Sequence, residues 1–407
     1  MDFASSSKLV AIAPYPIPCD IIEDMKPSLA LKWAAHATKF VIWVFAHPQL
    51  VIRYWRRFIL IAVDQSPFSF RVDLLGLILL RKRENNQRVQ RPILFRRTQD
   101  SVDILSRVAE ELCETVTFSS KSELTRHSML AKLVGCREVQ SHHVDWLGQG
   151  ITLDTVLPRD VIAEAVLDNL GLKSAPSVAY FFNENKDLQS RLEISDKKRQ
   201  QESWLQSNYE DFTELVTSDL LYGWKQFRAG AWTSHELPVE WSNFVTDLAR
   251  QRMTMGLQIA LARRVALVVC DIAGGFWLAA SLGKPHLVVN ICKYFTLLGP
   301  RGVIIPVLYR DIETGRVIPY SEALGSPIHN LTYREERKIM AVKATPSLIT
   351  ATFSELKFEI EAGEPSDLTE RQLEVLKIGR QRENKLRGGV VPRVSDAFLQ
   401  RYPDWIG

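Results

Sequence analysis

Several features that mark common protein classes are missing from this sequence. No apolar stretch reaches the length of about 18 residues that a membrane-spanning helix requires, and residues 1–7 lack the basic and apolar parts of a secretory signal. The five cysteines include no C-x-x-C pair, which indicates neither a zinc site nor a disulfide framework. We therefore expect a cytoplasmic protein without a metal.

The signature motifs of several enzyme classes are missing as well. There is no G-x-S-x-G, P-loop, H-E-x-x-H or kinase motif, which argues against serine hydrolases, NTPases and zinc proteases. No G-x-G-x-x-G follows a predicted strand, which weakens the case for a nicotinamide-dependent oxidoreductase. Because no RNA- or DNA-binding motif is present, we expect no nucleic-acid partner.

The sequence is long enough for two domains, and its predicted strands and helices alternate. It has 407 residues, 46% hydrophobic and 24% charged, and a domain takes roughly 100 to 200 residues. Apolar runs followed by segments of helical spacing predict an α/β fold, with a lobe boundary near residue 170. Strands are predicted at 72–80, 92–95, 177–182 and 224–230, and helices at 101–113, 208–222, 241–250, 254–262 and 368–386.

Basic charge is concentrated in the N-terminal part. Residues 1–100 hold fifteen Lys/Arg and eight Asp/Glu, a net charge of +7 against +4 for the whole chain. Residues 50–63 join a basic cluster to Trp and Phe, as interfacial helices do, and residues 81–97 hold seven basic residues and one acid. We expect residues 29–97 to meet an anionic membrane surface. Alternatively, the helix packs on the protein's own core and the basic run is a solvated loop.

The most informative segment is 263–292. In it, VALVVC and HLVVNI predict buried parallel strands, and AGGFWLAASLG between them supplies a Gly-Gly turn and a short helix. Glycine lets a backbone approach an anion, and the helix that follows directs its free N–H groups at a phosphate. Ligands lie beyond the carboxyl ends of strands in open α/β sheets, so we expect Asp271, Gly274, Gly275 and Phe276 at a ligand site. The alternative role of Gly-Gly is tight helix packing.

Two charged residues belong with this segment. Asp271 either hydrogen-bonds a ligand hydroxyl or caps the helix that follows it. Arg228, near the end of the strand predicted at 224–230, is a candidate for a bidentate clamp on a diphosphate. The alternative for Arg228 is a salt bridge within the protein.

With these residues in view, the order of segments resembles a family of bacterial glycosyltransferases of surface-polysaccharide clusters, which have a two-lobed, GT-B-like architecture. The strongest portion runs from FRAG at Phe227, through the 263–292 segment, to IIPVLYRDIETGRVIPYSEAL at 304–324, and the closing RVSDAFLQRYPDWI is also similar. The resemblance implies two Rossmann-like lobes in the following arrangement. An amphipathic, basic helical extension (1–66) precedes an acceptor lobe (67–170), a nucleotide-sugar donor lobe (171–345) and a helical tail (346–407).

The resemblance also implies which residues line the site. Arg228, Gly230, Gly274, Pro285 and Asn290 would line the donor pocket, and Glu322 would approach it from a later loop.

In the first lobe, Arg71 and Asp73 stand where the family has an Arg-x-Gly-His turn. The histidine is missing there, which leaves Asp73 as the acidic candidate for a general base. A surface or capping aspartate is the alternative.

The implied activity is metal-independent transfer of a sugar from a nucleotide-sugar donor to a polysaccharide or lipid-linked acceptor, without a cofactor, at the cytoplasmic face of a membrane. The sequence departs from the family pattern before Gly274, where Cys270, Ile272 and Ala273 replace glycine and small hydroxyl residues. It departs again in FFNENKD at 181–187, where the family favours a His-x-Arg-Asp strand end. The alternative is therefore a catalytically inactive partner or scaffold that docks at the membrane surface.

Overall fold

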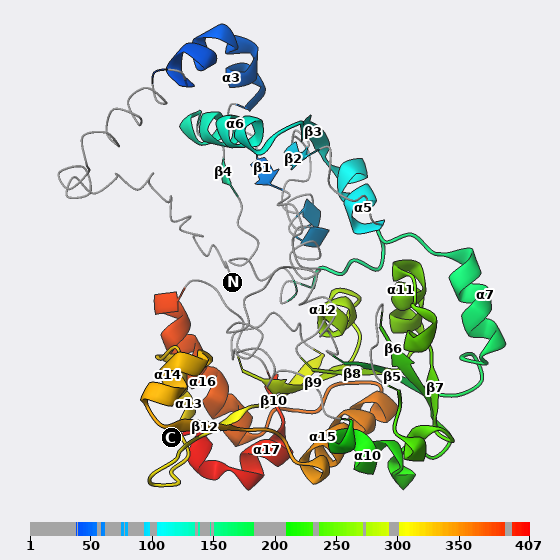
Figure 1. Ribbon diagram of the computed structural model, residues 1–407. Coiled ribbons are helices and arrows are strands. Elements are labelled where there is room, and N and C mark those ends of the chain that lie inside the picture. The colour runs from blue at the N-terminus through cyan, green and yellow to red at the C-terminus, as the bar shows by residue number, and fades with distance from the viewer. Residues whose placement is uncertain are drawn as a thin grey trace, which may run out of the picture.

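The computed structural model describes most of the second half of the chain and selected segments of the first half (Figure 1). The described residues are 38, 40–54, 58–61, 75–76, 78–79, 93–97, 104–134, 137–138, 147, 150–182, 209–230, 236–271, 274–292, 301–386 and 393–407. Within these ranges, no helix is both long enough and apolar enough to cross a membrane.

The first half of the chain forms a four-stranded parallel sheet with the strand order β3-β2-β1-β4. Its strands are β1 (Phe58–Ile61), β2 (Ile93–Arg97), β3 (Glu114–Phe118) and β4 (Arg137–Glu138). Helix α6 (Lys121–Leu133) packs against β2 and β3, and α3 (Pro48–Tyr54) packs on α6. Helix α5 (Ile104–Leu112) connects β2 to β3, as a parallel pair requires.

The second half forms a seven-stranded sheet in which every neighbouring pair is parallel. Its order is β13-β10-β9-β8-β5-β6-β7. The strands are β5 (Ser177–Phe181), β6 (Lys225–Ala229), β7 (Val245–Asp247), β8 (Leu267–Cys270), β9 (His286–Ile291), β10 (Gly302–Pro306) and β13 (Arg393–Val394).

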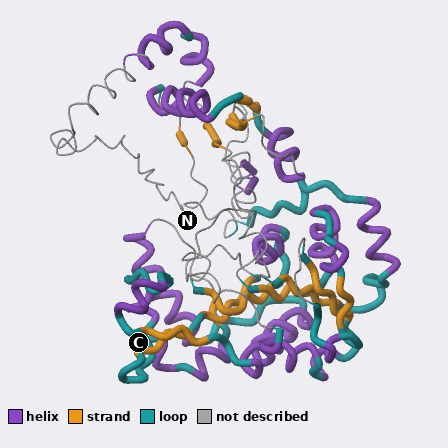
Figure 2. The backbone as a smooth tube through the Cα atoms, viewed as in Figure 1, coloured by secondary structure: helices purple, strands orange, loops and turns teal. Residues whose placement is uncertain are grey.

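Helices cover both faces of this sheet (Figures 1 and 2). One face carries α11 (Met255–Arg264) and α12 (Gly274–Ser281), and the other carries α10 (Glu210–Val216), α15 (Pro346–Ala362) and α17 (Asp396–Arg401). Because both faces are covered, β8 and β9 are buried along their whole length, which explains their continuous apolar sequences.

Numbered by position in the chain, the seven strands lie in the order 7-6-5-4-1-2-3. This is the doubly wound order of dinucleotide-binding folds with one strand added at the edge. The order reverses between β5, the first strand, and β8, the fourth. The predicted α/β class with two parallel sheets is confirmed.

Smaller elements complete the second half. Helix α7 (Val161–Asn169) packs on α11, and β11 (Leu308–Asp311) pairs antiparallel with β12 (Ile339–Val342). The remaining helices and 3-10 turns are η2 (Asp219–Leu221), η3 (Val239–Trp241), η4 (Ala249–Gln251), α13 (Tyr320–Leu324), α14 (Leu331–Glu336), α16 (Glu370–Leu386) and η5 (Pro403–Trp405).

The C-terminal tail is part of the second sheet and its helical cover, because β13 pairs with β10. Helix α16 begins with the predicted capping box. The backbone N–H of Gln372 donates to Oγ1 of Thr369 at 3.3 Å, and the N–H of Thr369 donates to Oε1 of Gln372 at 3.0 Å. The helix predicted at 368–386 is thereby confirmed together with its cap.

The helix predicted over 50–63 is wrong in its second half. Helix α3 ends at Tyr54, and β1 begins at Phe58 in the interior of the four-stranded sheet. The run FILI at 58–61 is apolar at every position, which is typical of strands in a parallel sheet and not of a helix with one solvent-exposed face.

Two other predicted elements are also wrong. The strand expected at 72–80 is helical at its described residues 75–76 and 78–79, where Leu75 and Ile78 are buried at a helical spacing of three. The helix expected at 241–250 is instead a short edge strand, β7, between two 3-10 turns. Its residues pair with β6, and this long-range pairing overrides the local helical pattern.

His286 at the start of β9 should make the fold sensitive to acid. Its side chain is buried, Nδ1 donates to the carbonyl oxygen of Lys284 at 2.8 Å, and burial lowers its pKa to about 4. An unfolded chain has a histidine pKa of about 6.5 and therefore takes up the proton first as the pH falls. The stability from the neutral ring is full above about pH 6.5 and is lost toward about pH 4.

We expect the wild-type chain to lose on the order of 3 kcal/mol more than a His286→Asn variant between neutral pH and about pH 4. Urea unfolding at a series of pH values measures the difference. Identical pH profiles for the two proteins would show that His286 is not responsible.

Candidate functional site

The reversal of strand order places a candidate site at the carboxyl ends of β5 and β8. In doubly wound sheets, ligands bind in the crevice outside these ends at the point of reversal. Here β5 ends at Phe181, β8 ends at Cys270 and is followed directly by Asp271, and α12 starts at Gly274. The sequence predicts a ligand site at Asp271, Gly274, Gly275 and Phe276. These residues therefore lie at the edge of the sheet where the topology favours a ligand.

The described residues at this edge are the strand ends and the start of α12. The loops that follow the four central strands lie outside the described residues: 183–208 after β5, 231–235 after β6, 272–273 after β8 and 293–300 after β9. Arg71 and Asp73, the two site residues predicted in the first lobe, lie outside them too.

Gly275 allows α12 to lie directly on β5. A Cβ atom at this position would be 2.2 Å from Cβ of Phe181 and 2.5 Å from its Cγ, well inside any contact that real side chains make. The close helix packing considered as the alternative role of the Gly-Gly pair is therefore present at Gly275. Contact of the pair with a phosphate stays a prediction.

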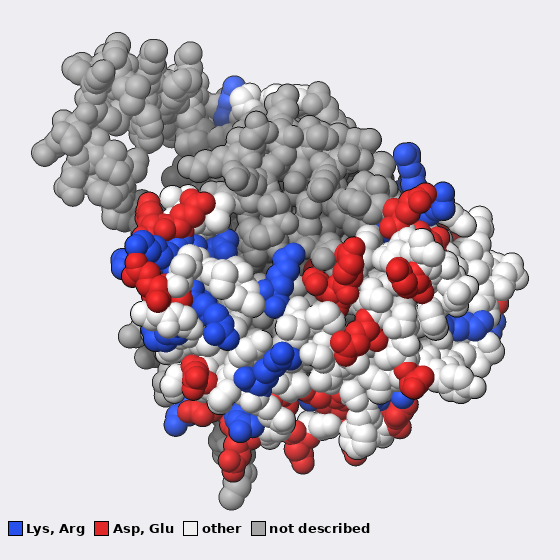
Figure 3. Space-filling model, turned by 60° about the horizontal axis from the view of Figure 1, so that its bottom comes forward, with Lys and Arg blue, Asp and Glu red and all other residues white. Residues whose placement is uncertain are grey.

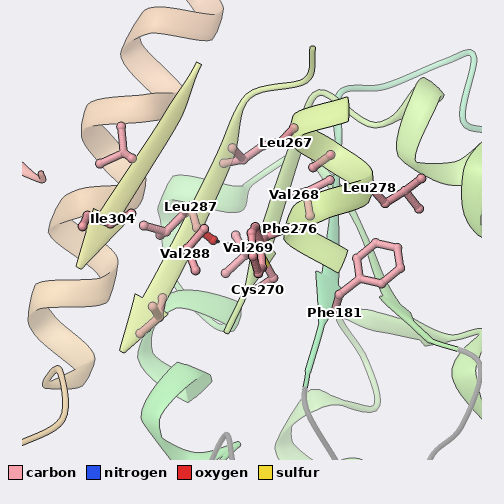
Figure 4. Close-up of a cluster of buried hydrophobic side chains, with 14 of the residues drawn as sticks. Phe181, Leu267, Val268, Val269, Cys270, Phe276, Leu278, Leu287, Val288 and Ile304 are labelled. Carbon is pink, nitrogen blue, oxygen red and sulfur yellow. Dashed lines mark hydrogen bonds between the residues drawn. The ribbon is translucent and has the colours of Figure 1, made fainter. Parts of the chain in front are cut away.

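The side chains around this contact form a continuous apolar cluster. Figure 4 shows residues of β8, β9 and α12 packed together beside Phe181. Phe276 belongs to this cluster, because its ring is buried and lies 4.9 Å from the ring centre of Trp277. The core thus fixes the first turn of α12 against the ends of β5 and β8.

Burial also sets the protonation of the Cys270 thiol at the end of β8. Burial and the neighbouring charge of Asp271 raise the pKa of the Cys270 thiol well above its usual value. The thiol is therefore protonated at neutral pH and donates to the carbonyl oxygen of Leu287 at 3.5 Å, so Cys270 is no nucleophile. The side chain of Asp271 itself is only 2% exposed.

Arg228 is fully buried on β6. Its Nη1 donates to Oδ2 of Asp247 on the paired strand β7 at 3.0 Å, and its guanidinium carbon lies 5.1 Å from the ring centre of Tyr209. The salt bridge considered as its alternative role is present, and it holds the edge strand to β6. A role of Arg228 as a diphosphate clamp stays a prediction.

Gly230 and Asn290 lie at the same edge of the sheet. Gly230 directly follows β6. Asn290 has a positive φ of 60°, a conformation that asparagine tolerates better than most residues. The register with β10 shifts at this position, and Oδ1 of Asn290 accepts a hydrogen bond from the backbone N–H of Ala344 at 2.7 Å. Asn290 therefore ties the chain leading to α15 to the end of β9.

The structure does not bring Pro285 to this edge. Pro285 precedes β9 and lines a small pocket at the opposite end of the strand with Arg301, Glu359 and residues of α15. Glu322 lies on α13, where it forms an ion pair with Arg316 at 3.1 Å in which both side chains are about half exposed.

Sequence reasoning missed two arginines at the end of α11, which lies beside the start of β8 and so at the edge of the sheet opposite the site. At the end of α11, Arg263 donates to Oδ1 of Asp154 at 2.6 Å and to the carbonyl oxygen of Leu157 at 2.7 Å, while Arg264 pairs with Asp168 at 2.6 Å. They fasten residues 154–168 to the helix that leads into β8. The basic end of α11 was a local signal, but its partners lie about a hundred residues away.

In the comparisons with known proteins, solved structures of glycosyltransferases align with the chain at low similarity. No protein-family model and no curated protein matches the chain. Among solved structures, E. coli ADP-heptose LPS heptosyltransferase II aligns with 11% identity over 75% of this chain and 99% of that chain, with a TM-score of 0.41. At TM-scores of this size, the alignments decide neither fold nor function.

Two further solved structures align at similar levels. A glycosyl transferase family 9 protein from Veillonella parvula DSM 2008 aligns with 10% identity over 62% of this chain and 86% of that chain, with a TM-score of 0.38. E. coli heptosyltransferase WaaC with ADP aligns with 11% identity over 61% of this chain and 90% of that chain, with a TM-score of 0.30.

The contact between α12 and β5 predicts that Gly275→Ala destabilises the protein, whereas a glycine-to-alanine change in a helix usually stabilises it. Replacing glycine by alanine inside a helix ordinarily stabilises a protein by about 1 kcal/mol. At Gly275 the added Cβ overlaps Phe181, and overpacking of this kind costs about 1 to 3 kcal/mol. We expect Gly275→Ala to lower the free energy of unfolding, measured by urea titration. An unchanged or raised stability would show that α12 does not lie this close to β5.

Proposed function

We propose that this chain is a glycosyltransferase that uses a nucleotide-sugar donor, with the diphosphate of the donor bound at the first turn of α12. One observation carries the proposal: the strand order reverses between β5 and β8, and Asp271 and the start of α12 lie at that reversal. The structural neighbours are too distant to add weight to it.

The start of α12 has the chemistry that a diphosphate needs. The first N–H groups of a helix have no partner within the helix, and the helix dipole places about half a positive charge at this end. Donors held rigidly by the core stabilise the charge that builds on a departing nucleoside diphosphate. In this proposal the amides replace a metal ion, and no cofactor takes part.

Asp271 takes a separate role. A buried carboxylate repels phosphate and accepts hydrogen bonds from hydroxyl groups, so it suits a ribose or sugar hydroxyl of the donor. In this proposal, the amides of α12 bind the diphosphate of the nucleotide-sugar, and Asp271 binds a hydroxyl group of its ribose or sugar.

The other half of the reaction rests on the resemblance of the sequence. Asp73 is the proposed base toward a polysaccharide or lipid-linked acceptor, with Arg71 beside it in sequence. Arg228, Gly230, Gly274, Gly275, Phe276, Asn290 and Glu322 complete the proposed donor site. The proposed place of reaction is the cytoplasmic face of a membrane.

Binding of the donor tests the proposal. We expect at least one member of a panel of UDP-, GDP-, CMP- and ADP-sugars to raise the melting temperature of the purified chain. Asp271→Asn keeps the shape and removes the charge, and hydrogen bonds to charged groups contribute about 1.5 to 3 kcal/mol. The dissociation constant for that donor should therefore rise about ten- to hundredfold in calorimetry.

Asp160→Asn is the matched control. Asp160 caps α7 by accepting hydrogen bonds from the N–H groups of Ile162 and Ala163, both at 3.1 Å, and asparagine caps a helix equally well. Arg228→Ala is a poor probe, because it leaves Asp247 without its buried partner. If no donor shifts the melting temperature, the chain is not a nucleotide-sugar enzyme. That result would favour the alternative, a catalytically inactive partner or scaffold.

A further inference from the structure

Two short helices near the N-terminus carry an apolar face that points outward. Residues 40–46 are helical, and α3 follows after His47. Their outward side chains are Val41, Ile42, Phe45 and Ile52, which are 51%, 63%, 82% and 77% exposed. We call these four residues the 41–52 face.

The opposite side of the same helices is firmly packed, which fixes the direction of the face. Phe40, Trp43 and Tyr54 pack against the small core that includes Phe118 and α6. The hydroxyl of Tyr54 hydrogen-bonds Nδ1 of the buried His127 at 2.7 Å, and the ring of Trp43 lies 5.0 Å from that of His127. The 41–52 face therefore cannot turn inward without breaking this core.

The position of the helices leaves the face open among the described residues. Figure 1 shows α3 at the far end of the first half of the chain, with α6 between it and the four-stranded sheet. The face is thus on the outer surface of that end, away from the seven-stranded sheet.

The charge around the face indicates the kind of partner. Residues 25–63 contain six Lys/Arg and no Asp or Glu. One of the six, Arg53, forms an ion pair with Glu114 at 2.7 Å, and the other five lie outside the described residues. On the face of the molecule in Figure 3, by contrast, acidic and basic side chains intermingle over the described surface. Apolar side chains within a segment of purely basic charge match the surface of an anionic bilayer, which offers both an acyl layer and negative headgroups.

A second exposed apolar face provides a contrast. On α7, Val161 and Ile162 are 80% and 79% exposed, but their helix also carries Glu164 and Asp168 and no basic residue. Exposed aliphatic side chains are therefore found both on α7 and on the 41–52 face. The single sign of the charge sets the 41–52 face apart.

We propose that the 41–52 face docks on an anionic lipid bilayer, with Ile42, Phe45 and Ile52 entering the boundary between headgroups and acyl chains. The basic residues of 25–63 other than Arg53, which pairs with Glu114, supply the attraction to the headgroups. This docking goes beyond the proposed transfer reaction and requires no nucleotide.

Sedimentation with vesicles tests the proposal on the full chain without nucleotide. We expect tighter binding to mixed phosphatidylcholine and phosphatidylglycerol vesicles than to phosphatidylcholine alone, and weaker binding as salt is raised. The double variant Ile42→Ser/Phe45→Ser should bind the mixed vesicles at least about tenfold more weakly, because two large side chains lose their burial. Val161→Ser/Ile162→Ser, equally exposed before substitution, should bind as the wild type does.

Ile52→Ser gives a second, independent variant of the face, and thermal melting checks that each variant is folded. Equal binding of the wild type and both face variants, or no sedimentation of the wild type, would overturn the proposal. It would also be overturned if the wild type were a dimer in solution that the face variants dissociate, because a second copy would then be the occupant. Donor binding by the face variants should be unchanged, which separates this result from the test of transfer.

Discussion

The direct packing of α12 on β5 is the contact on which the arrangement of the candidate site depends. Without a side chain at Gly275, the helix approaches Phe181 so closely that its first turn is fixed beside the carboxyl end of β5. The same helix follows β8, so it spans the reversal in strand order. A larger residue at 275 would move the start of the helix away from this edge of the sheet.

Most polar residues around this edge stabilise the protein itself. Arg228 holds β7 through Asp247, and Asn290 holds the chain before α15. Each contact joins separate elements of the chain, and together they brace the strands at whose ends the candidate site lies. In the function we propose, backbone groups of α12 recognise the phosphate, and Asp271 recognises a hydroxyl group of the donor.

Local patterns predicted the elements that are buried on both sides or capped by near neighbours. The apolar runs of β8 and β9 and the Thr369–Gln372 capping box are examples. Patterns failed where pairing at long range decides: residues 58–61 became a strand because β2 and β4 flank them, and residues 245–247 became a strand because β6 does. The role of Gly275 depends on Phe181, 94 residues earlier, and no local pattern could reveal it.

Hydrogen–deuterium exchange with and without a nucleotide-sugar measures most directly whether α12 binds a diphosphate. If the first turn of α12 and the end of β8 hold the donor, exchange should slow most in the peptide that covers Cys270 to Ser281, where the amides would become ligand-bonded. A donor that binds while leaving exchange in this peptide unchanged would contradict the assignment and place the site elsewhere on the chain.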